Sequence, residues 1–211
     1  MKNYICINDQ KVELTDEQVE QLRSGFGLPA VKLQDIAPGD TFKIGSHEFI
    51  VLEHCGEDTA VICKDLLCRE MAFGRNNNYN GSDVDTRCNA FAVEITALIG
   101  EGNILLHTVD LTSDDGLKDY GMVERHASLL TADRYRRYVE ILDKFPIKAY
   151  WWLSTAYSTP KHDDEMWVKC VSPSGFIFNG FYSAITAFAR FVFLNLLSLY
   201  LCERRKQYEQ H

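Results

Sequence analysis

The chain has 211 residues and a formal net charge of −8, because 30 Asp and Glu outnumber 22 Lys and Arg. Hydrophobic residues make up 46% of the chain and charged residues 25%, which is the composition of a globular protein and excludes a disordered one. The acidic balance argues against a nucleic-acid partner held by bulk charge, since such domains present a basic face. The length suits one domain with a small appendage.

The first 28 residues are predicted to form a β-β-α appendage. Residues 4–14 place apolar side chains on both sides of an Asn-Asp pair, which indicates a hairpin. Thr15 is a predicted helix N-cap, and Gln18, three residues later, completes a capping box. Charged side chains interrupt residues 1–26, so we expect no signal peptide.

Residues 33–201 are predicted to form an α+β domain, followed by a polar tail over residues 202–211. Ser82 and Thr131 have the chemistry of N-caps and predict helices beginning at the next residue. The expected helices cover residues 83–91 and 132–142, and the expected strands cover residues 41–44, 48–52, 59–63, 105–111, 167–171 and 176–179.

The cysteines and acidic residues predict no metal or cofactor site. Seven cysteines occur at irregular spacings without a Cys-x-x-Cys pair, so free buried thiols are the expected state. Asp110, Asp114 and Asp115 do not follow calcium-loop spacing and are interpreted as a turn. No phosphate-binding glycine loop or nucleophile motif occurs, and no cofactor is expected.

The longest apolar stretch covers residues 184–201 and favours buried strands over a membrane span, because Arg190, Asn195 and Ser198 interrupt it. Residues 176–200 mix aromatic and small polar side chains, which is also typical of an adaptable binding surface. For this segment, a buried core is favoured over a binding surface. Trp151 and Trp152 are adjacent, so in a strand one indole is expected in the core and the other nearer a surface. A structural role for both is favoured over a ligand contact.

Several short signatures follow one another in order along the chain. They are Ile-Ala-Pro-Gly-Asp at residues 36–40, Gly-Ser-Asp-Val-Asp-Thr-Arg at 81–87, His-Thr-Val-Asp-Leu-Thr at 107–112, Ser-Leu-Leu-Thr at 128–131, Tyr-Trp-Trp-Leu-Ser at 150–154 and Ala-Arg-Phe at 189–191. Together they resemble an uncharacterised domain family of bacteria and their phages. That family is similar in turn to the C-type-lectin-like fold of formylglycine-generating enzymes.

The resemblance implies a C-type-lectin-like α+β fold with two main helices and antiparallel sheets. It departs from the family where Ser154 replaces an arginine and Phe191 replaces a proline. The cysteine pair of the formylglycine enzymes has no counterpart in the context of Cys170 and Cys202. The resemblance therefore implies a scaffold rather than that activity.

The expected function is a non-enzymatic recognition module, phage or prophage encoded, in the bacterial cytoplasm or on a virion. The expected ligand is a protein, with a small molecule as the less favoured choice, and no membrane partner is expected. Two alternatives stay open: a phage inhibitor of a host defence system, and an enzyme with an unrecognised site related to the formylglycine enzymes. The sequence leaves the oligomeric state open.

The candidate ligand-binding residues lie between residues 152 and 190. Loops on a rigid scaffold carry function, and aromatic side chains supply contact area at low entropic cost. For Arg190 a structural salt bridge or backbone clamp is favoured over a ligand contact. The candidates are Trp152, Tyr157, Lys161, His162, Asn179, Phe181, Tyr182 and Arg190.

If no metal supports the fold, a chelator leaves stability unchanged. We expect the melting temperature in excess EDTA to equal that in buffer, measured by circular dichroism. A clear fall in melting temperature, restored by added zinc or calcium, would contradict this expectation.

Overall fold

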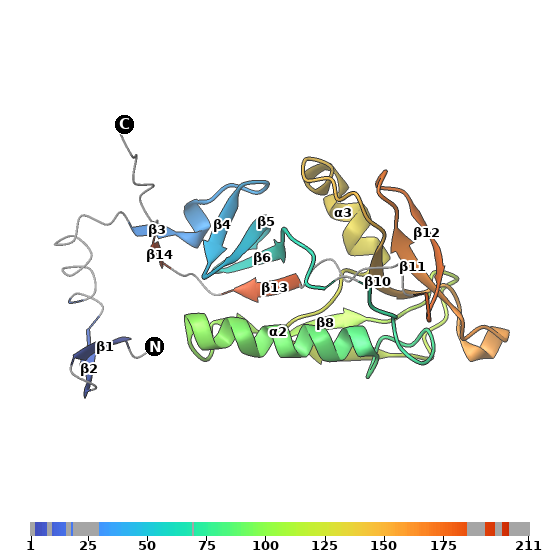
Figure 1. The fold of residues 1–211 in the computed structure, drawn as a ribbon, viewed down its shortest axis with the longest axis horizontal. Coiled ribbons are helices and arrows are strands. Elements are labelled where there is room, and N and C mark those ends of the chain that lie inside the picture. Colours follow the sequence, from blue (N-terminus) through green and yellow to red (C-terminus); the bar gives the residue numbers. More distant parts are fainter. Residues whose placement is uncertain are drawn as a thin grey trace.

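A computed structural model describes residues 3–7, 10–15, 18, 30–68, 70–184, 193–196 and 200–202 (Figure 1). Within these residues, the α-helices α2 (Asp83–Ile99) and α3 (Ala132–Leu142) accompany short antiparallel sheets. The strands are β1 (Asn3–Ile7), β2 (Gln10–Leu14), β3 (Ala30–Lys32), β4 (Thr41–Ile44), β5 (His47–Cys55), β6 (Asp58–Cys63), β7 (Ile104–Leu105), β8 (His107–Asp110), β9 (Met122–Arg125), β10 (Trp151–Ala156), β11 (Trp167–Val171), β12 (Ile177–Phe181), β13 (Phe193–Leu196) and β14 (Tyr200–Cys202). The α+β class is confirmed.

The largest sheet has the order β4-β5-β6-β13-β7 and contains the predicted three-stranded meander. Its centre is apolar, since Phe49, Ile50 and Val51 of β5 have no exposed surface. The strand β13 comes from the apolar stretch near the end of the chain and lies between β6 and β7. Part of that stretch therefore forms sheet, as expected, and no helix in the described residues is long and apolar enough to cross a membrane.

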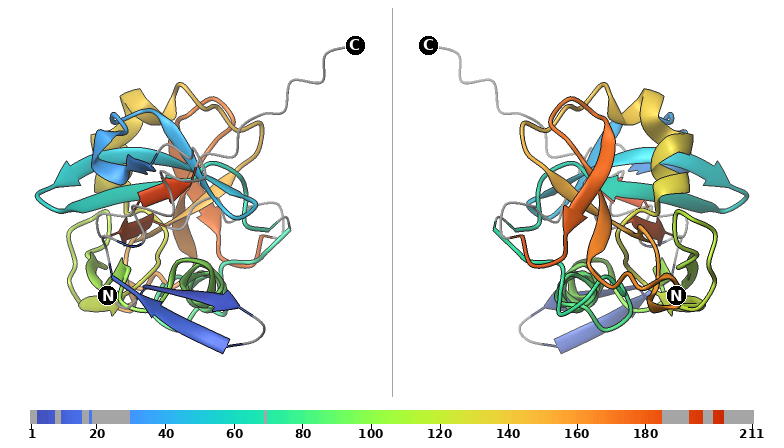
Figure 2. Two further views of the ribbon diagram at one scale, coloured as in Figure 1. Left: turned by 90° about the vertical axis from the view of Figure 1, so that its left-hand side faces the viewer. Right: turned by 90° about the vertical axis from the view of Figure 1, so that its right-hand side faces the viewer.

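The helix α2 begins at the predicted N-cap, where the Ser82 hydroxyl accepts a hydrogen bond from the Asp85 amide. The prediction was wrong about its length, because the helix continues to Ile99 and ends at Gly100, which has a φ of +91°. Val93 and Leu98 are exposed, so the outer face of the second half is partly apolar and hides the helical periodicity. The helix lies along the long axis of the molecule and is seen end-on in Figure 2.

The helix α3 has the predicted bounds and N-cap, with the Thr131 hydroxyl accepting a hydrogen bond from the Arg134 amide. It lies on the opposite side of the strands from α2 (Figures 1 and 2). Its Tyr135 ring contacts Trp151 edge-to-face, at 5.4 Å between ring centroids. The helix therefore covers one face of the second large sheet, which has the order β10-β11-β12.

Other expected features lie at the ends of the chain. The N-terminal hairpin is confirmed by the pairing of β1 with β2, and the Thr15–Gln18 capping box by its two reciprocal hydrogen bonds. The strand β14 pairs with β3, which joins two segments about 170 residues apart. The turn at residues 8–9, most of the helix after Thr15, and Arg190 lie outside the described residues.

A buried ion pair fastens the start of α2 to β9. Arg125 donates from Nε to Asp85 Oδ1 at 2.8 Å and from Nη2 to Asp85 Oδ2 at 2.7 Å. Only 3% of the Asp85 side chain is exposed, and the Gly81 amide also donates to its carboxylate. The hydrogen bond to the Asp85 side chain raises the pKa of the Arg125 guanidinium, so Arg125 stays protonated.

Removal of one partner should leave an uncompensated buried charge. We expect Arg125→Ala to lower the free energy of unfolding by about 3 kcal/mol. Arg136→Ala is the matched control, because Arg136 is half exposed and its pairs with Asp133 and Asp114 are open to solvent on the arginine side, so its loss should cost less than about 1 kcal/mol. Urea denaturation measures both variants, and equal losses would contradict the prediction.

Candidate functional site

The adjacent tryptophans of β10 form the floors of two hollows on opposite faces of the β10-β11-β12 sheet. Successive strand residues point to opposite faces, which places Trp151 toward α3 and Trp152 toward Phe73. The expectation that one indole lies nearer a surface was wrong, since Trp151 is 2% exposed and Trp152 is fully buried. Both hollows are bounded by the β11–β12 turn, residues 172–175.

The Trp152 hollow is the larger, with a volume of about 630 Å³, and its lining is mainly apolar. Its rim is aromatic: Phe176 is 63% exposed and Tyr150 is 45% exposed. Phe178 lies between them, edge-to-face with Tyr150 at 5.2 Å and stacked on Phe176 at 6.0 Å. This is an exposed aromatic patch around a concave surface, the arrangement that marks binding sites.

The floor of the Trp152 hollow is rigid. The indole Nε1 of Trp152 donates a hydrogen bond to the Met71 carbonyl at 3.1 Å, and the ring packs on Phe73. Gly180 lies directly over the ring, where a Cβ would come within 2.6 Å of Cys170 Sγ and 3.0 Å of Trp152. Only glycine therefore fits at position 180, and a ligand would meet a surface that is already ordered.

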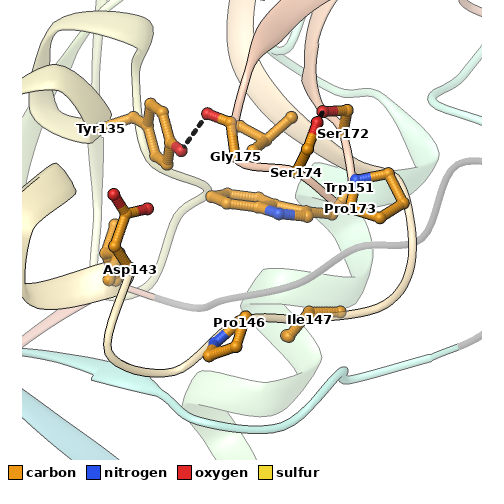
Figure 3. Close-up of a pocket in the computed structure, with 11 residues that line it drawn as sticks. Tyr135, Asp143, Pro146, Ile147, Trp151, Ser172, Pro173, Ser174 and Gly175 are labelled. Atoms are coloured by element: carbon orange, nitrogen blue, oxygen red, sulfur yellow. Dashed lines mark hydrogen bonds between the residues drawn. The ribbon is translucent and has the colours of Figure 1, made fainter.

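The Trp151 hollow lies between α3 and the β11–β12 turn and has a volume of about 390 Å³ (Figure 3). Tyr135 crosses one side and donates a hydrogen bond to the Gly175 carbonyl at 2.5 Å. Gly175 has a φ of +83°, and a Cβ there would lie 3.3 Å from the Asp143 carboxylate. This hollow has a more polar lining than the Trp152 hollow.

Two of the candidate residues contact Lys169 on the Trp151 face of the sheet. Lys169 Nζ, on a side chain only 10% exposed, donates to Asn179 Oδ1 at 2.9 Å and lies 5.2 Å from the Tyr157 ring centroid. It also pairs with Asp114 at 2.7 Å. Burial raises the pKa of Asp114, but the hydrogen bonds from Lys169 and Arg136 outweigh it and lower the pKa overall.

The candidate His162 lies on the short helix η2 (Pro160–His162) and contacts Asp115 at 3.0 Å. The same carboxylate accepts hydrogen bonds from Ser113 and Ser158, both at 2.5 Å, and these donors hold the pKa of Asp115 well below its usual range. Ser158 and His162 thus share one carboxylate oxygen, Asp115 Oδ2. The Ser158 hydroxyl therefore directs its proton at a carboxylate rather than at the histidine.

The buried thiols are poor nucleophiles at neutral pH. Burial raises the pKa of Cys88 to about 12, and burial also raises the pKa of Cys170 well above its usual value. A thiol with such a pKa carries almost no thiolate at pH 7. Within the described part of the chain, no group of three or more metal-ligating side chains is found either.

The structure separates the candidate residues rather than uniting them in one site. Trp152 forms a floor, Asn179 and Tyr157 contact Lys169, and His162 contacts Asp115, while Lys161 is exposed. Phe181 and Tyr182 are half-buried and stack on each other at 4.9 Å.

Sequence reasoning missed the rim residues Tyr150, Phe176 and Phe178. The period-2 alternation of a strand could have found the last two, because it places both on one face.

No family model, no curated protein and no solved structure matches the chain.

The contacts of Lys169 with Asp114 and Asn179 are expected to stabilise the folded state. We expect Lys169→Met to lower the free energy of unfolding by about 2 kcal/mol, because Asp114 and Asn179 lose a charged donor. Lys161→Met is the matched control, and its effect should stay within about 0.5 kcal/mol because Lys161 is exposed. Urea denaturation measures both, and a neutral Lys169→Met variant would contradict the role given to Lys169.

Proposed function

We propose that the protein is a non-enzymatic recognition module that binds an apolar segment of a protein ligand in the Trp152 hollow. The observation that carries the proposal is the aromatic rim of Phe176, Phe178 and Tyr150 around a concave apolar surface. Protein interfaces are enriched in aromatic side chains that fill or line such hollows.

The energetics favour this face over the rest of the sheet. Covering about 100 Å² of the exposed rim rings contributes about 2.5 kcal/mol of hydrophobic free energy. The floor costs little ordering entropy on binding, because Trp152 is held by Met71, Phe73 and the close approach of Gly180. A preformed apolar surface of this kind suits a ligand that brings apolar side chains.

The proposal includes a C-type-lectin-like scaffold of phage or prophage origin, located in the bacterial cytoplasm or on a virion. The ordered sequence signatures and the two helices with antiparallel sheets support the scaffold. Five cysteines in the described part of the chain are free thiols, which supports a reducing compartment.

A random peptide library displayed on phage tests the binding function directly. Peptides enriched on the immobilised protein should bind Phe176→Ser at least about tenfold more weakly, a loss of about 1.4 kcal/mol. Met122→Ser is the control, because Met122 is 64% exposed, as Phe176 is at 63%, but lies on β9 away from the hollow.

Binding is measured by titration calorimetry with the enriched peptide in synthetic form, after melting curves have confirmed that both variants fold. Failure to enrich any peptide, or equal affinity for wild type and Phe176→Ser, would overturn the proposed site.

A further inference from the structure

The outer edge of β12 carries backbone groups that face away from the rest of the sheet. Hydrogen bonds from the Ser172 amide to the Phe176 carbonyl and from the Tyr182 amide to the Met166 carbonyl mark two hydrogen-bonded pairs in the β11–β12 register. Such pairs alternate along an antiparallel ladder, so Phe178 and Gly180 bond to β11. Ile177, Asn179 and Phe181 then direct their backbone groups outward.

The described strands leave this edge unpaired, whereas the other edge of the same sheet is covered. The sheet order β10-β11-β12 places β12 outermost, as the right-hand view of Figure 2 shows. Along β10, the Ser154 amide donates to the Leu130 carbonyl, and the Ala156 carbonyl accepts from the Asp114 amide. On β12 the Phe181 carbonyl accepts from the Ala184 amide.

The β12 edge also lacks the features that prevent edge strands from associating. Natural edges are protected by lysine, proline or a bulge. β12 has the sequence Ile-Phe-Asn-Gly-Phe, and its pairing with β11 is regular over five residues. Residues 170–189 contain no charged side chain at all. By contrast β4, an edge strand of the larger sheet, carries Lys43.

We propose that β12 pairs antiparallel with β12 of a second copy of this chain, around a two-fold axis at Asn179. In this register Asn179 lies opposite its own counterpart, and Ile177 lies opposite Phe181 of the second copy. All three outward-facing residues are then matched, whereas a shift by two residues would leave one of them unmatched on each copy. The two Asn179 residues exchange two hydrogen bonds, and the two Phe181 amides donate to the Ile177 carbonyls.

Side-chain complementarity supports this register. Phe178 lies opposite Gly180 of the second copy, and aromatic rings commonly cover glycine across neighbouring strands. Gly180 carries no side chain above the Trp152 ring, so Phe178 of each copy packs over Gly180 of the other. On the same face Phe176 lies opposite Tyr182, and on the other face Ile177 meets Phe181. Every apolar side chain of the edge therefore finds an apolar or glycine neighbour.

The interface is small, so the dimer forms at micromolar concentration rather than at nanomolar concentration. Each copy carries a net charge of −8, which opposes association. Because salt screens this repulsion and the edge itself is uncharged, higher ionic strength should strengthen the dimer.

Sedimentation equilibrium of the full chain, from about 1 to 500 µM, tests the proposal. Wild type should pass from monomer to dimer over this range. Asn179→Pro removes an outward amide without touching the β11 ladder and should weaken the dimer at least about tenfold. Asn179→Ala keeps that amide, loses only the side-chain bond to Lys169, and should dimerise like wild type.

A second variant guards against misfolding of the proline variant. Asn179→Asp keeps an acceptor for Lys169 in the monomer but places two carboxylates opposite each other at the two-fold axis, so it should be monomeric. A monomeric wild type at the highest concentration would overturn the proposal. So would a dimer that survives both Asn179→Pro and Asn179→Asp, because it would use another surface. Asn179 does not line the Trp152 hollow, so these outcomes are separate from those of Phe176→Ser.

Discussion

The arrangement of this protein depends on burying two adjacent tryptophans on one strand. Their side chains point to opposite faces of β10, so both faces of the small sheet need a cover. On one face α3 supplies Tyr135 against Trp151, and on the other Phe73 packs on Trp152. Beside both covers lies the β11–β12 turn, which α3 contacts through the hydrogen bond from Tyr135 to the Gly175 carbonyl. The two hollows lie at that turn, and the two indoles form their floors.

Buried polar groups fix the loops that surround this sheet. Asn77 donates to the carbonyls of Ser158 and Trp167 and accepts from the Tyr120 hydroxyl at 2.6 Å, so one side chain joins three segments. The Asp85–Arg125 pair does the same for α2 and β9. These groups are satisfied by partners of fixed geometry, and a buried group without them would cost free energy. The aromatic rim is therefore presented by an ordered frame.

The two sides of the small sheet suit different roles. The Lys169 face is polar and internally paired, with Asp114, Asn179 and the Tyr157 ring around one ammonium group. The Trp152 face is apolar, and two residues of its rim, Phe176 and Tyr150, are exposed to solvent. Gly180 links this face to the β12 edge, because it carries no side chain over Trp152 where a neighbouring strand would lie. Recognition in the hollow and pairing at the edge are thus neighbouring uses of one surface.

Local patterns in the sequence determined the elements that depend on nearby residues: the meander β4-β5-β6, α3 with its Thr131 cap, and β11 with its bounds. The end of α2 was missed because Val93 and Leu98, apolar but exposed, obscure its face. Only the tertiary structure decided that β13 lies between β6 and β7, that both indoles are buried, and that Phe176 and Tyr150 border a hollow. Those outcomes depend on contacts between residues far apart in the chain, where packing and the pairing of backbone groups, rather than local propensity, set the free energy.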